Sequence, residues 1–413
     1  MPVTYAPLWN TLNERRLTVT QLRISTGIAP NTMTRLRHNE EVSLSILGRI
    51  CDFLKCDYNN ILKYIPAQFT EYTTRLGTFT IKNRRYLGNK YKLLPFISDV
   101  VEKYCPDIES VADIFSGTGS VASAFSNRNL ITNDILYSNY ICNLAWFGSQ
   151  DFDENKIGEL ISNYNCINGN EENYMTRNFA DTYFSRVDCS KIGIIRENIE
   201  KKFNGGFLNE RERALLIMTL IYAMDRIANT CGHYDAYIQK AVFERPLLLA
   251  FPEAPHNNSP KNFCYNEDAN QLVRRISADL FYIDPPYNSR QYCDAYHLLE
   301  NVARWEQPEV FGVARKPDRK NQKSKYCSKK AADAFEDLIE NIKAKYILFS
   351  YNNMSDKGND RSNARMTDED IFRILEKNGN VQVFEEPYRA FSAGKSDIKN
   401  NVERLFLCTR QSK

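Results

Sequence analysis

The sequence predicts an α/β protein with a small all-α unit in front of it, and three observations support this. Apolar residues recur at helical spacing through the first 66 residues. Residues 110–115 read as a strand that continues into a glycine turn, 116–120, and then a helix, as in the crossover of a parallel sheet. The apolar run 279–283 reads as a second buried strand, and it ends in Asp284-Pro285-Pro286-Tyr287.

Length and charge set the broad class. A chain of 413 residues exceeds the size that one hydrophobic core usually serves, so we expect two or three structural units. With 43% apolar and 25% charged residues, the chain has the composition of an ordinary globular protein. The net charge is only +3, but basic residues concentrate in two stretches, 67–92 and 315–330, which are candidates for contact with phosphates.

The cysteines and histidines give no sign of a metal site. Eleven cysteines occur singly, without a Cys-x-x-Cys pair, and four histidines lie far apart. Neither a zinc site nor a disulfide framework is therefore predicted. No window approaches the roughly 20 consecutive apolar residues that a bilayer span requires, and no signal peptide is recognised. We expect a cytoplasmic protein without a metal and without a membrane partner.

The first 66 residues are expected to form four or five short helices. Thr18 precedes Gln21 by three positions, the spacing of a capping box, and the helix that it opens would end before Gly27. The next helix would begin near Pro30, in the first turn, and continue to His38. Two helices joined in this way are a helix-turn-helix signature.

Met33 and Leu36 would form the buried side of the second of these helices. The supporting core would contain Leu44, Leu47, Ile50, Cys51 and Leu54. Residues 8–66 resemble the Cro/C1-type (Xre-like) helix-turn-helix domain, which implies that this helix enters the major groove of DNA. The residues expected to contact DNA are Asn31, Thr32, Thr34, Arg35 and Arg37. A small helical bundle used for protein contact is the alternative.

The glycine turn at 116–120 is suited to a nucleoside ligand. Glycines let the backbone pass close to a ligand, and the helix that follows offers free N–H groups. Residues 130–135 read as the next strand, with Asn133 and Asp134 at its end, and an acidic residue there can accept both hydroxyls of a ribose. The third glycine of the dinucleotide fingerprint is missing, which counts against NAD.

The tetrapeptide after the strand at 279–283 can hold a planar base. Its two prolines fix φ and lack N–H donors, so the turn offers the carboxylate of Asp284 and outward carbonyl groups, while Tyr287 supplies a ring for stacking. An exocyclic amine is a poor nucleophile, and it is activated when its hydrogens are engaged by acceptors as positive charge develops. The turn therefore predicts chemistry on the amino group of a base.

Four segments, in this order, resemble the alpha class of Dam-type adenine-N6 DNA methyltransferases. They are Tyr86-Leu87-Gly88-Asn89-Lys90, Phe115-Ser116-Gly117-Thr118-Gly119, Asn133-Asp134 and Asp284-Pro285-Pro286-Tyr287. The resemblance implies a Rossmann-like fold with a mostly parallel seven-stranded sheet and S-adenosylmethionine as methyl donor. The residues that would bind the donor are Tyr86, Lys90, Phe115, Gly117, Gly119, Asp134, Asp268 and Asp284. Residues 229–237, 287–292 and 296–300 resemble a branch of this class found in restriction-modification systems.

The resemblance also implies the catalytic residues. Asp284 and the carbonyl of Pro285 would accept hydrogen bonds from the amine, Pro286 would complete the turn, and Tyr287 would stack on a base flipped out of the duplex. Neither a metal nor a covalent intermediate is needed. The proton released by the amine could pass to Asp284 or to water.

The resemblance places a target-reading region before the tetrapeptide. We expect a helix-turn-helix domain at 1–66, a linker at 67–83, a catalytic domain at 84–147 and 262–413, and a helical insertion at 148–261. The insertion includes an apolar helix at 210–229. The residues expected to contact DNA here and in the basic run are His233, Tyr234, Tyr237, Lys320 and Lys323. A packed hairpin for the first three and a solvated loop for the two lysines are the alternatives.

The sequence therefore predicts a site-specific adenine-N6 methyltransferase of double-stranded DNA, acting as the modification half of a type II restriction-modification system beside a cognate endonuclease. The helix-turn-helix domain would regulate transcription. The alternatives are an RNA methyltransferase acting on a base amino group, and a DNA-binding regulator whose methyltransferase part is inactive. Cytosine-N4 as the target, the recognition sequence, and the choice between monomer and dimer stay open.

Overall fold

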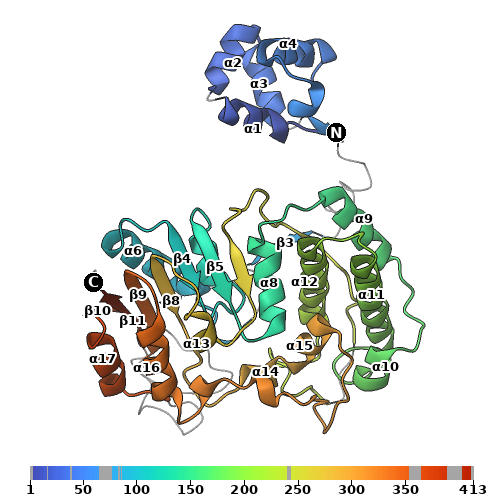
Figure 1. Cartoon of the computed structure of the whole chain (residues 1–413). Coiled ribbons are helices and arrows are strands. Elements are labelled where there is room, and N and C mark those ends of the chain that lie inside the picture. Colours follow the sequence, from blue (N-terminus) through green and yellow to red (C-terminus); the bar gives the residue numbers. More distant parts are fainter. Residues whose placement is uncertain are drawn as a thin grey trace. The chain divides into compact units, whose positions relative to one another are not determined.

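The computed structural model describes residues 3–15, 17–37, 40–64, 77–81, 84, 86–239, 243–352, 364–387 and 402–410. The chain divides into two compact units, Met1–Gly77 and Thr78–Lys413, and each is described by itself (Figure 1). Among the sequence-based predictions, His38 and most of the proposed linker 67–83 lie outside the described residues.

The first unit is a small helical bundle. Its elements are β1 (Val3–Thr4), α1 (Ala6–Glu14), α2 (Val19–Thr26), α3 (Pro30–Arg37), α4 (Leu44–Leu54) and β2 (Lys63–Tyr64). The predicted capping box is present, because the Thr18 side chain accepts from the N–H of Gln21 and the Gln21 side chain accepts from the N–H of Thr18. Gly27 follows α2 with φ +62°, a conformation that glycine adopts without strain.

The core of this unit is almost the predicted one. Met33 and Leu36 are buried on α3, and Leu47, Ile50 and Leu54 are buried on α4, while Cys51 packs against them from an intermediate position. The prediction for Leu44 was wrong, because its side chain is 72% exposed. Leu44 is the first residue of α4, and the helical spacing that relates it to Leu47 and Leu54 does not extend the core to that end.

A seven-stranded sheet forms the centre of the second unit, as predicted (Figure 1). Its strands are β4 (Ser110–Asp113), β5 (Asn129–Asn133), β7 (Phe263–Tyr265), β8 (Leu280–Ile283), β9 (Tyr346–Asn352), β10 (Asn380–Pro387) and β11 (Val402–Thr409). The spatial order is β10-β11-β9-β8-β4-β5-β7. Strand β11 runs in the direction opposite to that of the other six strands. The short strands β3 (Thr78–Phe79) and β6 (Phe251–Pro252) pair separately.

Helices cover the sheet on both faces, as in a doubly wound fold (Figure 1). Those beside the sheet are α6 (Leu94–Tyr104), α7 (Ser120–Ala124), α8 (Tyr137–Phe147), α13 (Ala269–Leu272), α16 (Ala331–Asn341) and α17 (Asp368–Glu376). One buried cluster joins α13, α16 and α17 to apolar side chains of the strands, including Phe281 and Phe349. Strands β8 and β9 are buried along their whole length because they lie in the middle of the sheet.

Further helices lie outside α8. Four of them fall within the predicted insertion 148–261, namely α9 (Glu154–Asn165), α10 (Tyr174–Phe179), α11 (Arg186–Asn204) and α12 (Glu210–Ile227). Two more, α14 (Tyr292–Ala295) and α15 (His297–Arg304), follow β8 in the chain. The predicted apolar helix at 210–229 is α12, which packs between α8 and α11 (Figure 1). A helix that is covered on both sides must be apolar over most of its surface, and nearly every residue of α12 from Ala214 to Met224 is buried.

Three further observations concern features considered in the sequence. No helix among the described residues combines the length and the apolar character that a membrane crossing requires. All eleven cysteines carry free thiols. Within the same described residues, no group of three or more histidine, cysteine, aspartate or glutamate side chains is arranged to hold a metal ion.

Candidate active site

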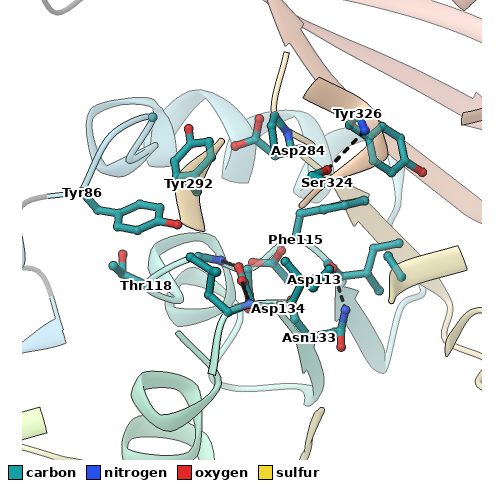
Figure 2. Close-up of a pocket in the computed structure, with 18 of the residues that line it drawn as sticks. Tyr86, Asp113, Phe115, Thr118, Asn133, Asp134, Asp284, Tyr292, Ser324 and Tyr326 are labelled. Carbon is teal, nitrogen blue, oxygen red and sulfur yellow. Dashed lines mark hydrogen bonds between the residues drawn. The ribbon is translucent and has the colours of Figure 1, made fainter. Parts of the chain in front are cut away.

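A pocket lies at the carboxyl edge of the sheet, where the loops after β4, β5, β7 and β8 meet (Figure 2). Ligands of open α/β sheets bind at this edge. About 1020 Å³ of space there is free of protein atoms, part of it open to solvent. The predicted site residues that line it are Tyr86, Lys90, Phe115, Gly117, Asp134, Asp268, Asp284 and Pro286.

The glycine turn after β4 has no room for side chains. Gly117 has φ +51° and Gly119 has φ +80°. A Cβ atom on Gly119 would lie 2.6 Å from Cε2 of Phe147 and 2.8 Å from Oδ1 of Asn143, both of which are on α8. A Cβ on Gly117 would meet the Tyr86 ring at 3.2 Å. The turn therefore brings bare backbone to the pocket wall, although Gly119 itself does not line the pocket.

Asp134 lies at the end of β5 and faces this turn. One carboxylate oxygen accepts from the N–H of Gly117 at 2.9 Å, and the other accepts from the N–H of Leu136 at 2.8 Å. Burial raises the pKa of Asp134 to about 6, although these hydrogen bonds act in the opposite direction. Asn133 fixes the strand end, because its side-chain amide bonds to the backbone of Ile114 and Glu267.

Asp113, the last residue of β4, was not predicted from the sequence. Its side chain is 1% exposed and lines the pocket beside Asp134 (Figure 2). Neither of its carboxylate oxygens forms a hydrogen bond within the described residues. Burial and the charge of Asp284 raise the pKa of Asp113 well above its ordinary value, with nearby N–H groups of Ala122 and Phe115 opposing. A buried, unsatisfied carboxylate that faces a pocket can receive a cationic group.

The turn after β8 carries a buried group of charges. The ammonium of Lys90 lies 3.1 Å from Oδ1 of Asp284 and 2.9 Å from Oε1 of Glu403. Ser350 donates to the same oxygen of Glu403 at 2.9 Å. Burial raises the pKa of Asp284 to about 6, against the lowering effect of Lys90. Glu403 comes from β11, 119 positions after Asp284, and nothing in the sequence pattern pointed to it.

Tyr287 packs against Tyr351 of β9. The ring of Tyr351 meets that of Tyr287 edge to face, with centroids 6.1 Å apart. The N–H of Arg365 donates to the carbonyl of Tyr287 at 2.8 Å, and the Tyr351 hydroxyl lies 3.4 Å from the same carbonyl. Tyr287 and Pro285 do not line the pocket itself.

Three tyrosines pack together beside the pocket, and two of them, Tyr86 and Tyr292, line it. The ring of Tyr86 stacks on that of Tyr296 at 4.6 Å and on that of Tyr292 at 5.4 Å. The Tyr296 hydroxyl accepts from the N–H of Leu87, and the Tyr292 hydroxyl donates to the carbonyl of Leu87. Tyr86 and Tyr292 are seen on one side of the pocket, with Phe115 and Tyr326 on the other (Figure 2). Tyr292 and Tyr296, which follow the tetrapeptide, thus hold the segment 86–87 in place.

Part of the basic run 315–330, which was predicted to contact phosphates, lines the pocket. Ser324 and Gln291 exchange two hydrogen bonds, at 2.9 and 3.1 Å, and both residues line the pocket. The predicted DNA contacts Lys320 and Lys323 are exposed beside this segment. Their contact with DNA stays a prediction.

The residues at 233–237 divide between surface and interior. The prediction that Tyr234 contacts DNA was wrong, because its side chain is 2% exposed and its hydroxyl donates to Asp225 at 2.8 Å. A large aromatic ring with a polar tip is stable inside the protein when its hydroxyl finds an acceptor. His233 and Tyr237 are partly exposed, and His233 lies 3.7 Å from Asp235. For these two residues DNA contact stays a prediction.

In the first unit, the predicted DNA-reading residues share one surface of α3. Asn31, Thr34, Arg35 and Arg37 are exposed and Thr32 is partly exposed, while Met33 and Leu36 face the core. This arrangement leaves a polar helix face available to a groove of DNA.

Comparison with known proteins identifies both units. Residues 86–358 match the family described as D12 class N6 adenine-specific DNA methyltransferase, and residues 7–67 match the Cro/C1-type HTH DNA-binding domain. The chain is 36% identical to the modification methylase StsI of Streptococcus sanguinis over 79% of its own length and 52% of that protein. It is 33% identical to the type II methyltransferase M.FokI of Planomicrobium okeanokoites over 78% and 51%.

A third relative is the type II methyltransferase M.NlaIII of Neisseria lactamica. The chain is 32% identical to it over 76% of its own length and 95% of that protein. By contrast, the chain spans about half the length of StsI and M.FokI.

Proposed function

The chain belongs to the D12 class N6 adenine-specific DNA methyltransferases, and from this membership we propose that it methylates the N6 amino group of adenine in double-stranded DNA. The observation that carries the proposal is that residues of the glycine turn, Asp134 and the Asp284 turn line the same pocket. A methyl donor and an amine acceptor must meet in one place for direct transfer.

The residues of the pocket fit S-adenosylmethionine as the donor. When bound, this molecule supplies an electrophilic methyl group on a sulfonium centre. Asp134 would accept the ribose hydroxyls, since each of its oxygens retains a lone pair beside the N–H that it already accepts. Asp113 has unsatisfied carboxylate oxygens with which to bind the ammonium group of the donor. The bare backbone at Gly117 leaves space for the donor, which a side chain would fill.

The Asp284 turn would hold the adenine. Its carboxylate and the carbonyl of Pro285 would accept the two hydrogens of the amino group, orienting the nitrogen lone pair toward the methyl group. Tyr287 would stack on the base after it leaves the duplex, because N6 cannot react inside the base stack. The raised pKa of Asp284, about 6, makes it a better proton acceptor than an ordinary aspartate.

The proposed biological role is modification within a restriction-modification system. StsI, M.FokI and M.NlaIII carry names of modification or type II methyltransferases, and we propose the same role here, with a cognate restriction endonuclease as functional partner. The helix-turn-helix unit would bind operator DNA and regulate transcription. We therefore expect that removing residues 1–66 leaves the methylated sequence unchanged and abolishes binding to the promoter. Loss of methylation specificity would contradict this division of roles.

Sequencing DNA from cells that express the protein, with a method that detects modified bases, tests the function. Adenine-N6 methylation at one recurring sequence is expected, and it should disappear in Asp284→Asn cells. Purified protein with labelled donor should methylate duplex DNA of that sequence and leave ribosomal RNA unlabelled. Labelling of RNA alone, or N4 methylation of cytosine, would refute the proposed substrate.

A further inference from the structure

The pairing of Lys90 with two acidic partners at the Asp284 turn goes beyond what the tetrapeptide implies. The Lys90 side chain is 7% exposed, and those of Asp284 and Glu403 are 16% and 5% exposed. One ammonium therefore serves two largely buried carboxylates. Such an arrangement leaves an excess negative charge in a region of low polarity, which is unfavourable unless it has a use.

Glu403 reaches this position because β11 is the reversed strand of the sheet. It pairs antiparallel with β9, with Glu403 opposite Asn352. A strand that runs against its neighbours begins at the edge where they end, so the first residues of β11 lie at the carboxyl edge beside Asp284. The carboxylate of Glu403 is then fixed by the hydroxyl of Ser350 from β9.

The position of the ammonium determines what Asp284 can do. If Lys90 paired with Asp284 alone, its hydrogens would be directed at that carboxylate and would weaken it as an acceptor. The distances instead divide the ammonium between Oδ1 of Asp284 and Oε1 of Glu403.

On this basis, and resting on the proposed function, we propose that Glu403 is a positioning residue for methyl transfer: it draws Lys90 partly away from Asp284, so that the Asp284 carboxylate remains a strong acceptor for the amino group of adenine. Glu403 itself does not touch the base.

Charged and titratable groups from several elements surround Asp284. They are Lys90, Glu403, Asp113, Tyr282, Tyr287 and Tyr292. Burial raises the pKa of Asp284 most, Lys90 lowers it, and the charge of Glu403 raises it further. Removing the charge of Glu403 must therefore lower the pKa of Asp284, because Lys90 then stabilises its ionised form without competition.

The test is the pH dependence of a single methyl-transfer turnover on duplex DNA with saturating donor. For Glu403→Gln, the acid limb of the rate profile should move about 0.5–1 pH unit lower. The plateau rate should fall roughly tenfold, with the donor KM within about twofold of the parent protein. Glu403→Asp retains the charge and should lie between the two, which keeps the test decisive if Glu403→Gln does not fold.

Glu212→Gln is the matched control. Glu212 is 2% exposed and pairs with Lys156 at 2.8 Å, so this change also removes a buried charge from a lysine, but it does so on α12 and outside the pocket. It should lower stability and leave the acid limb in place. The inference is overturned if Glu403→Gln keeps the parental limb and plateau, or if Glu212→Gln shifts the limb equally. If the parent protein methylates no DNA, the proposed function fails, and the inference fails with it.

Discussion

The two units of the chain present their candidate functional side chains in opposite ways. In the first unit these side chains belong to one helix, α3, and lie on its exposed side. In the second unit, the pocket residues come from segments between Tyr86 and Glu403, and they are buried or partly buried. An exposed polar face requires little from the fold, whereas a buried charge must be paired or it destabilises the protein.

This difference teaches how each unit can fail. A change on the surface of α3 should remove a contact with DNA and leave the unit folded. A change in the pocket should disturb a network in which each charge depends on its neighbours, so its effects on the reaction and on stability are coupled. The following experiments test this contrast, from the largest expected effect to the smallest.

Asp284→Asn should have the largest effect on the reaction. The amide keeps the shape of the side chain but loses the negative charge that receives the amine, so the methyl-transfer rate should fall roughly 10³-fold. Donor binding, measured by calorimetry, should persist, because Asp113, Asp134 and the glycine turn are unchanged. Asp318→Asn, on the surface, is the control. A variant retaining a tenth of the parental rate would show that the acceptor role is misplaced.

The glycines compare the two units directly. Gly119→Ala would place a Cβ 2.6 Å from Phe147 at φ +80°, so its unit should lose about 3 kcal/mol of stability. Gly27→Ala meets its nearest atom only at 3.9 Å, at φ +62°, and should lose about 1 kcal/mol. Hydrogen exchange in urea, read for each unit separately, measures both values. Equal losses would contradict the contrast between a packed pocket and an open surface.

Arg35→Ala should weaken binding of the full chain to its promoter DNA by roughly 10–100-fold, the usual cost of one base contact. Methylation of the recognition sequence should stay at the parental rate, because Arg35 lies outside the second unit. Lys103→Ala removes one positive charge in the same way, from an exposed residue of α6, and is the control for promoter binding. Equal weakening by both variants would mean that general charge, rather than α3, supports the binding.

The smallest effect is that of pH on the parent protein. Asp284 must be ionised to accept the amine, and its pKa of about 6 means that the saturated rate should halve near pH 6 and decrease further below it. Asp134 also has a pKa of about 6, so the donor Kd should rise over the same range. Promoter binding by the first unit should not change over this range, because Asp284 and Asp134 lie in the second unit. A rate that stays level down to about pH 5 would contradict the raised pKa.

Local patterns were sufficient for much of the molecule. The capping box at Thr18, the buried side of α3 and helix α12 follow from the spacing of a few neighbouring residues, and the structure has them where the sequence indicated. The order of the glycine turn, Asn133-Asp134 and the Asp284 tetrapeptide carried the family resemblance, and the mostly parallel sheet that this resemblance implied is present.

Other features were out of reach because they depend on partners distant in the chain. Tyr234 lies in a stretch that the sequence predicted to contact DNA. In the structure its ring is buried and its hydroxyl donates to Asp225, and the sequence does not show that this acceptor is near. Leu44 fitted the helical spacing of the core, but among the described residues no element covers it at the start of α4.

The sequence by itself therefore indicated most helices and strands, the class of chemistry and Asp284 as the candidate catalytic residue, since these depend on short segments whose physical constraints are local. Only the tertiary structure decided which charges surround Asp284. Lys90, Glu403 and Asp113 meet there because one strand is reversed and two others end side by side. The interaction energy between two buried charges depends on the distance between them across the sheet, and no local sequence pattern encodes that distance.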